Sequence, residues 1–221
     1  MPSRLSRNVK IQDELRQKTK KLLAEKKVDV VIGYGPTETG SVGAVFYTDP
    51  ANCGQLLWNE RCTTNLIVYL KRKEVQKFGK AAIIVKGCDS KALAVLEIEK
   101  QLDRDRLYVI GVVCEGVWND SNSKTHTDAV KCGVCDVHEP LHCDLVLGSE
   151  GEPKLQKSLD ERYQKLENIL AMSMEERLAY WKKEFDRCFK CYACRQVCPM
   201  CYCQVCVADK NRPVRFDTSA T

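Results

Sequence analysis

The chain has 221 residues, of which 44% are hydrophobic and 29% are charged, and its formal net charge is +5 at neutral pH. These values are ordinary for a globular chain that buries a core. The apolar runs are only a few residues long, whereas a bilayer span needs about 20, so no membrane span is predicted. The N-terminal segment is polar and basic and lacks the apolar stretch of a secretory signal, which favours a cytoplasmic location.

Residues 1–150 are predicted to be an α/β domain. Strands are predicted over residues 28–33, 41–47, 81–85 and 107–113. Helices are predicted over residues 8–27, 58–72 and 90–101, the last with Asp89 or Ser90 as its N-cap. Continuous apolar strands that alternate with helices are typical of a largely parallel sheet with flanking helices. The segment Gly33–Gly40 is interpreted as a turn, because no helix start follows it as a nucleotide-binding loop requires.

Residues 151–221 are predicted to form a smaller part, a helical hairpin followed by a metal-binding segment. Residues 149–153 are typical of a linker, and a helix is predicted over 155–171. Ser173 and Glu176 have the spacing of a capping box, which predicts a second helix that leads directly into a run of cysteines.

The chain contains fourteen cysteines, and these indicate the class of protein to which it belongs. A secreted disulfide scaffold is usually short and follows a signal peptide, so metal sites in a reducing compartment are favoured. Only three histidines are present, so sulfur would supply most ligands, which selects iron–sulfur clusters or zinc. Metal-bound cysteines are thiolates, so the formal charge overstates the basicity of the protein, and no nucleic-acid partner is inferred from it.

Seven cysteines lie within nineteen residues near the C-terminus: Cys188, Cys191, Cys194, Cys198, Cys201, Cys203 and Cys206. The first four have the Cys-x2-Cys-x2-Cys-x3-Cys-Pro spacing of bacterial ferredoxins, in which the fourth cysteine commonly serves another cluster. Zinc is the alternative, although structural zinc usually uses two Cys-x2-Cys pairs about 15–20 residues apart. The last three cysteines do not repeat the ferredoxin spacing. A second cluster, completed by a cysteine from elsewhere, is favoured there over zinc or free thiols, because crowded free thiols would oxidise.

Four more candidate ligands lie in the α/β domain. Cys88 and Cys114 each follow a predicted buried strand, and sites in open α/β sheets gather at the carboxyl ends of the strands. Cys132 and Cys135 form a Cys-x2-Cys pair. The residues alone leave open whether all four share a cluster or whether the pair consists of two structural cysteines on a turn.

These motifs resemble those of the deazaflavin-dependent hydrogenase and dehydrogenase β-subunit family over about residues 28–150. The segments that carry the resemblance are Lys86-Gly-Cys-Asp-Ser90, Val113-Cys-Glu-Gly116, Lys131-Cys-Gly-Val-Cys135 and Cys143-Asp-Leu-Val-Leu-Gly148. The chain departs from the family where Gly87 replaces a proline and where the N-terminal glycine pair of the family is not evident.

The resemblance implies one 4Fe–4S cluster that is bound by Cys88, Cys114, Cys132 and Cys135, with Cys62 and Cys143 as alternate ligands. It also implies FAD, since family members bind a flavin and some reduce the deazaflavin coenzyme. Family members act as subunits of larger redox complexes in anaerobic archaea and bacteria.

The leading hypothesis is an iron–sulfur electron-transfer subunit of a cytoplasmic oxidoreductase complex. Two or three 4Fe–4S clusters would relay electrons between a partner subunit's flavin or metal site and another carrier, a task that needs no catalytic acid or base. The alternatives are a flavoprotein that reduces a deazaflavin or a similar soluble coenzyme, and a zinc-stabilised binding module. The expected partners are the other subunits of a redox complex.

Overall fold

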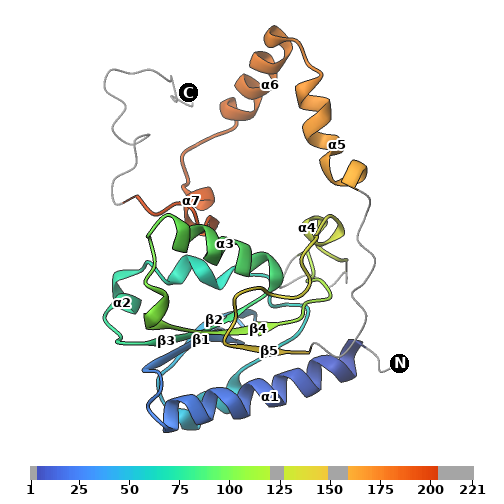
Figure 1. The fold of residues 1–221 in the computed structure, drawn as a ribbon. Coiled ribbons are helices and arrows are strands. Elements are labelled where there is room, and N and C mark those ends of the chain that lie inside the picture. Colours follow the sequence, from blue (N-terminus) through green and yellow to red (C-terminus); the bar gives the residue numbers. More distant parts are fainter. Residues whose placement is uncertain (1–3, 120–126, 149–158, 204–221) are drawn as a thin grey trace. The chain divides into compact units, whose positions relative to one another are not determined.

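The computed structural model describes residues 4–119, 127–148 and 159–203 (Figure 1). The chain divides into two units, Met1–Gln156 and Lys157–Thr221. Among the described residues, no helix combines the length and the apolar character that crossing a membrane demands.

A five-stranded sheet forms the centre of the first unit, with the strand order β2-β1-β3-β4-β5. The strands are β1 (Val30–Pro36), β2 (Val42–Tyr47), β3 (Ala81–Val85), β4 (Leu107–Val112) and β5 (Leu145–Leu147). β1 and β2 pair antiparallel as a hairpin, and all other neighbours pair parallel. The predicted α/β fold with a largely parallel sheet and flanking helices is therefore confirmed.

Helices cover both faces of this sheet. α1 (Arg4–Ala24) lies against one face and α3 (Gly87–Ile98) lies against the other (Figure 1). β3 is buried along its whole length. A strand that is covered on both sides needs apolar side chains in both directions, which explains the uninterrupted apolar sequence of β3.

The glycines of the segment Gly33–Gly40 allow close packing and a tight turn in the β1–β2 hairpin. Gly33 and Gly35 lie within β1, where a Cβ at Gly35 would lie 2.4 Å from the hydroxyl of Tyr47. The chain then turns, with the amide of Thr37 donating to the carbonyl of Ser41 at 2.9 Å and with Gly40 at a φ of 76°. The interpretation of a turn is confirmed, although β1 extends further into the segment than predicted.

The helix predicted over residues 58–72 is wrong. The segment instead contains irregular turns and a 3-10 helix over Leu66–Tyr69, and the short helix α2 (Lys73–Gln76) follows. The side chain of Asn59 accepts from the amide of Arg61 at 2.8 Å, and the side chain of Asn65 accepts from the amide of Ile67 at 2.9 Å. Such local bonds compete with the helical hydrogen bonds that the hydrophobic pattern suggested.

Helix α3 begins three residues earlier than predicted. Its N-cap is Lys86, whose amide donates to Asp89 Oδ2 at 3.0 Å. Asp89 is therefore inside the first turn rather than at the cap. The shift also places Cys88 in the first turn, where the partial positive charge of a helix N-terminus favours thiolates.

The second unit contains α5 (Leu159–Leu170), α6 (Met174–Asp186) and the short α7 (Ala193–Val197). The predicted capping box is present, since the amide of Ser173 donates to Glu176 Oε2 at 2.8 Å and the amide of Glu176 donates to Ser173 Oγ at 3.2 Å. The cysteine run starts directly after α6.

Ile84→Ala tests the core of the first unit. Ile84 is fully buried in β3, so its truncation is expected to lower the free energy of unfolding by about 2–5 kcal/mol in chemical denaturation. Ile98→Ala is the matched control, because Ile98 is 80% exposed at the end of α3 and its truncation should change stability by less than about 0.5 kcal/mol. Equal losses in the two variants would contradict the described core.

Candidate metal centre

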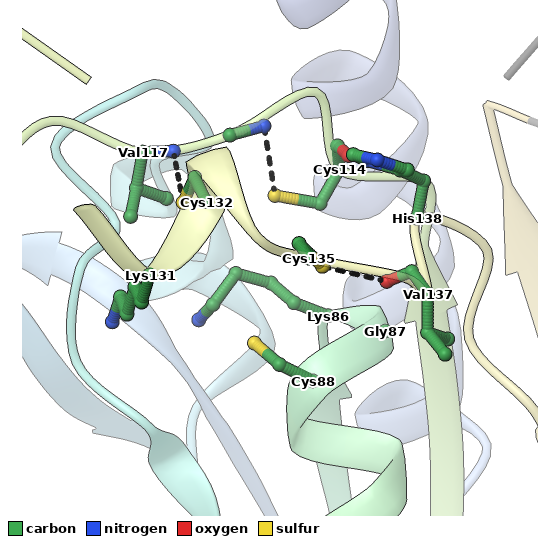
Figure 2. A pocket seen from close by; sticks show the side chains of 11 residues that line it. Lys86, Gly87, Cys88, Cys114, Val117, Lys131, Cys132, Cys135, Val137 and His138 are labelled. Carbon is green, nitrogen blue, oxygen red and sulfur yellow. Dashed lines mark hydrogen bonds between the residues drawn. The ribbon is translucent and has the colours of Figure 1, made fainter. Parts of the chain in front are cut away.

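A cavity of about 60 Å³ opens at the carboxyl ends of β3 and β4 (Figure 2). It brings together four predicted ligands from three places in the fold: the start of α3, the loop after β4, and the short helix α4 (Val130–Gly133) with the turn that follows it. The lining residues are Lys86, Gly87, Cys88, Cys114, Gly116, Val117, Lys131, Cys132, Cys135, Val137 and His138.

The pairing of β3 with β4 positions the first two cysteines. The strands run parallel, with Val85 opposite Gly111, so the chain leaves both strands at the same edge of the sheet. Cys88 follows three residues after β3 and Cys114 two residues after β4. This is the arrangement that the sequence predicted for these two residues.

A short ladder positions Cys132. Trp118 and Asp128 form an antiparallel bridge, and the amide of Ala129 donates to the carbonyl of Val117 at 2.8 Å. The amide of Val117 then donates to Cys132 Sγ at 3.3 Å. These bonds hold the segment that carries Cys132 next to the loop that carries Cys114.

A backbone contact positions the turn after Cys135. A Cβ at Gly87 would lie 1.8 Å from the carbonyl oxygen of Val137, closer than any side chain can approach. Only glycine at position 87 therefore lets the start of α3 touch this turn. The contact explains the departure from the family pattern, because a proline at this position would carry a Cβ into the carbonyl.

Backbone amides point at two of the cavity sulfurs. The amide of Gly116 donates to Cys114 Sγ at 3.4 Å, besides the bond from Val117 to Cys132 described above (Figure 2). Cys135 Sγ instead donates to the carbonyl of Val137 at 3.4 Å. Amide donors of this kind hold thiolate ligands and tune the potential of a metal centre.

Two lysines add positive charge to the cavity wall. Lys131 Nζ donates to the carbonyl of Thr63 at 3.1 Å, and Lys86 Nζ donates to the carbonyl of Thr64 at 3.0 Å. Burial lowers the pKa of Lys86, but the combined effects of Asp89, Tyr34 and Cys88 outweigh it and hold the pKa above its usual value. Lys86 is therefore a permanent cation inside the protein.

Burial also acts on the thiols themselves. It raises the pKa of Cys88 to about 12, with a further rise from the Asp89 carboxylate. It raises the pKa of Cys114 to about 11, although the amide of Gly116 opposes the rise. The Cys88 side chain is nevertheless exposed and that of Cys114 is half-buried. Thiols of this kind become thiolates when a bound metal compensates their charge.

The cysteines surround a space rather than a point. In the described ranges, no three histidine, cysteine, aspartate or glutamate side chains are placed to hold one metal ion. The four cysteines instead lie around one shared cavity (Figure 2).

The two alternate ligands lie elsewhere. Cys62 is fully buried outside the cavity lining, where its sulfur accepts from the amide of Asn59 at 3.4 Å. Cys143 Sγ lies beside Gly111, where a Cβ would be only 2.7 Å from it. Neither thiol lines the cavity.

The cysteines of the second unit form a separate group. The described members are all exposed, namely Cys188, Cys191, Cys194, Cys198, Cys201 and Cys203. Cys206 lies outside the described residues. Lys190 and Tyr192, just before and just after Cys191, have φ values of 55° and 60°. Non-glycine residues rarely adopt this left-handed conformation, and such strain gathers at functional sites.

Sequence reasoning missed Lys86 and Gly87 as parts of the site. A lysine directly after the buried strand Ala81–Val85 was one available signal, because a charge at such a position needs a partner. The role of Gly87 depends on a contact with Val137, fifty positions along the chain, which no local pattern reveals.

The sequence is similar to curated proteins that include two β subunits of formate dehydrogenases. It is 27% identical over 170 residues to the β subunit of an F420-dependent formate dehydrogenase from Methanocaldococcus jannaschii, with 63% of this chain and 41% of that protein covered. It is 22% identical over 273 residues to the β subunit of F420-dependent formate dehydrogenase 1 from Methanococcus maripaludis, with 84% of this chain and 68% of that protein covered. This similarity confirms the predicted resemblance to β subunits, and the chain spans less than half of the first relative.

Among solved structures, the F420-reducing NiFe hydrogenase complex from Methanosarcina barkeri contains a chain that matches with a TM-score of 0.42 and 14% identity. The match covers 50% of this chain and 42% of that chain. No family model matches the sequence.

Gly87→Ala tests the contact that assembles the cavity. The added methyl group cannot share space with the carbonyl of Val137, so the turn must move, at an expected cost of about 1–3 kcal/mol in the free energy of unfolding. Gly54→Ala is the matched control, since a Cβ there meets nothing within 4 Å. Equal stability of the two variants in denaturant titration would contradict the contact.

Proposed function

We propose that this protein is an iron–sulfur electron-transfer subunit of an oxidoreductase complex. One 4Fe–4S cluster would be bound in the first unit by Cys88, Cys114, Cys132 and Cys135, and one or two more would be bound by the cysteines of the second unit. The observation that carries the proposal is the cavity itself, which collects four sulfurs from separate parts of the chain.

The wall of the cavity suits an anionic sulfur-bound cofactor. The donor set is all thiolate, which selects iron–sulfur or zinc, and its arrangement around a space fits a cluster. Two amides donate to ligand sulfurs, and Lys86 and Lys131 face the cavity with positive charge. Each of these features lowers the cost of placing negative charge there.

The second unit supports further clusters by spacing and by backbone conformation. Cys188, Cys191, Cys194 and Cys198 have the ferredoxin spacing, which crowds successive sulfurs around one centre. The left-handed residues on either side of Cys191 make the chain turn sharply between ligands. Cys201 and Cys203, with Cys206, are the proposed ligands of an additional cluster.

Such clusters, when bound, take up and release single electrons. The contribution of the chain is to hold the sulfurs and to set the charge of the first cavity. The relatives are β subunits of F420-dependent formate dehydrogenases, which supports a place for this chain beside other subunits of a redox complex. Its donor would then be a flavin or metal site of a partner, and its acceptor another carrier.

Iron and acid-labile sulfide counts on anaerobically purified protein test the proposal directly. Two clusters should give about eight irons and eight sulfides per chain, and three should give about twelve of each. A colourless protein with stoichiometric zinc and no iron would overturn the redox proposal and favour the zinc-stabilised binding module.

Single cysteine variants test the proposed ligand sets. Cys88→Ala should lose about four irons per chain while the clusters of the second unit remain, because only the first cavity loses a ligand. Cys191→Ala should lose iron from the second unit while the cluster of the first cavity remains. Cys143→Ala is the control and should keep all the iron, since its sulfur lies outside the cavity. Loss of iron in the control equal to that in Cys88→Ala would refute the ligand assignment.

A further inference from the structure

The wall of the first cavity contains an ion pair that is almost completely buried. The side chains of Lys86 and Asp89 are 2% and 1% exposed, and Lys86 Nζ lies 2.9 Å from Asp89 Oδ2. Removing two charges from water costs free energy that their attraction only partly returns, so a buried pair is weak evidence of a stabilising role. The position of the pair beside the cavity suggests a role in the centre instead.

Both charges are held in fixed positions. Lys86 Nζ donates to Asp89, to the carbonyl of Thr64 at 3.0 Å and to the hydroxyl of Tyr34, which accounts for its three protons. Tyr34 is itself buried and donates to the same carbonyl of Thr64 at 2.6 Å. Asp89 accepts from the amide of Lys86 at the start of α3.

Only one of the two charged residues lines the cavity, but both lie near Cys88. Lys86 lines the cavity, and its ammonium group lies beside the side chain of Cys88 (Figure 2). Asp89 does not line the cavity, but its Oδ1 lies 3.8 Å from Cys88 Sγ. Because both side chains are almost completely buried, water screens their charges only weakly, so both act on whatever the four sulfurs bind.

We propose that the Lys86–Asp89 pair sets the reduction potential of the cluster in this cavity, with Lys86 raising the potential and Asp89 lowering it. The inference rests on the proposed function, because it requires a cluster at the four cysteines. A cluster gains one negative charge when it accepts an electron from its donor. A fixed ammonium group stabilises that reduced state and a fixed carboxylate destabilises it.

Two substitutions separate these effects. Lys86→Gln removes the positive charge and keeps a donor for Asp89, so the midpoint potential should become more negative. Asp89→Asn removes the negative charge and keeps an oxygen for the amide of Lys86, so the midpoint potential should become less negative. Lys91→Met is the control, because Lys91 lies on the same helix, is 45% exposed and pairs with Asp136, where water screens its charge. The midpoint potential of the cluster in Lys91→Met should equal that in the unsubstituted protein.

The measurement is an anaerobic redox titration of the full chain, followed by electron paramagnetic resonance. The relevant signal is the one that disappears in Cys88→Ala. Opposite shifts in Lys86→Gln and Asp89→Asn support the inference, whereas a purely structural disturbance would shift both variants in the same direction. Shifts of the same sign, or no shift in either variant, overturn it.

If Lys86→Gln does not retain the cluster, Asp89→Asn decides alone, and an unchanged or more negative potential overturns the inference. Failure of the proposed function has a different signature. In that case Cys88→Ala removes neither iron nor any signal from the wild-type pattern, whatever the other variants do.

Discussion

The parallel pairing of β3 with β4 is the constraint on which the rest of the first unit depends. Because Val85 lies opposite Gly111, the two strands end together, and the residues that follow them start from neighbouring positions. β5 continues the same parallel order beside β4, with Leu145 opposite Ile110. The segment that leads into β5 packs against Gly111, where a side chain would collide with Cys143. Without this register, the cysteines after the two strands would not meet.

The central strands could be predicted from the sequence, because strands buried on both faces need unbroken apolar runs. The edge strand β5 has only three residues and no such signal. The helix predicted over residues 58–72 failed for a different reason. Its hydrophobic residues are buried, but Asn59 and Asn65 form local turns that the hydrophobic pattern does not reveal. In this segment, side-chain hydrogen bonds to the backbone took the place of helical hydrogen bonds.

The two groups of cysteines were predictable to different degrees. In the second unit the ligand spacing is local, so the sequence alone predicts a cluster-binding segment. In the first unit the ligands meet only through the sheet and through the contact of Gly87 with Val137. The residues therefore suggested a shared site without settling it, and the structure brings the four cysteines to one cavity. The buried ion pair beside it could not be predicted, because Lys86 finds Tyr34 and Thr64 only in the folded chain.

The apolar core of the sheet and the cavity depend on different contacts. This difference affects how the protein would respond to the oxidation of a bound cluster. Cys132 and Cys135 belong to a segment that is held against the rest of the unit by hydrogen bonds, by the Lys91–Asp136 ion pair and by the contact of Gly87 with Val137, whereas the sheet has an apolar core of its own. A cluster in the cavity would cross-link this segment to α3 and to the loop after β4. Its oxidative loss would remove these cross-links and leave the apolar core of the sheet in place. Repair would then require only new iron and sulfide, delivered to a scaffold that had kept its shape.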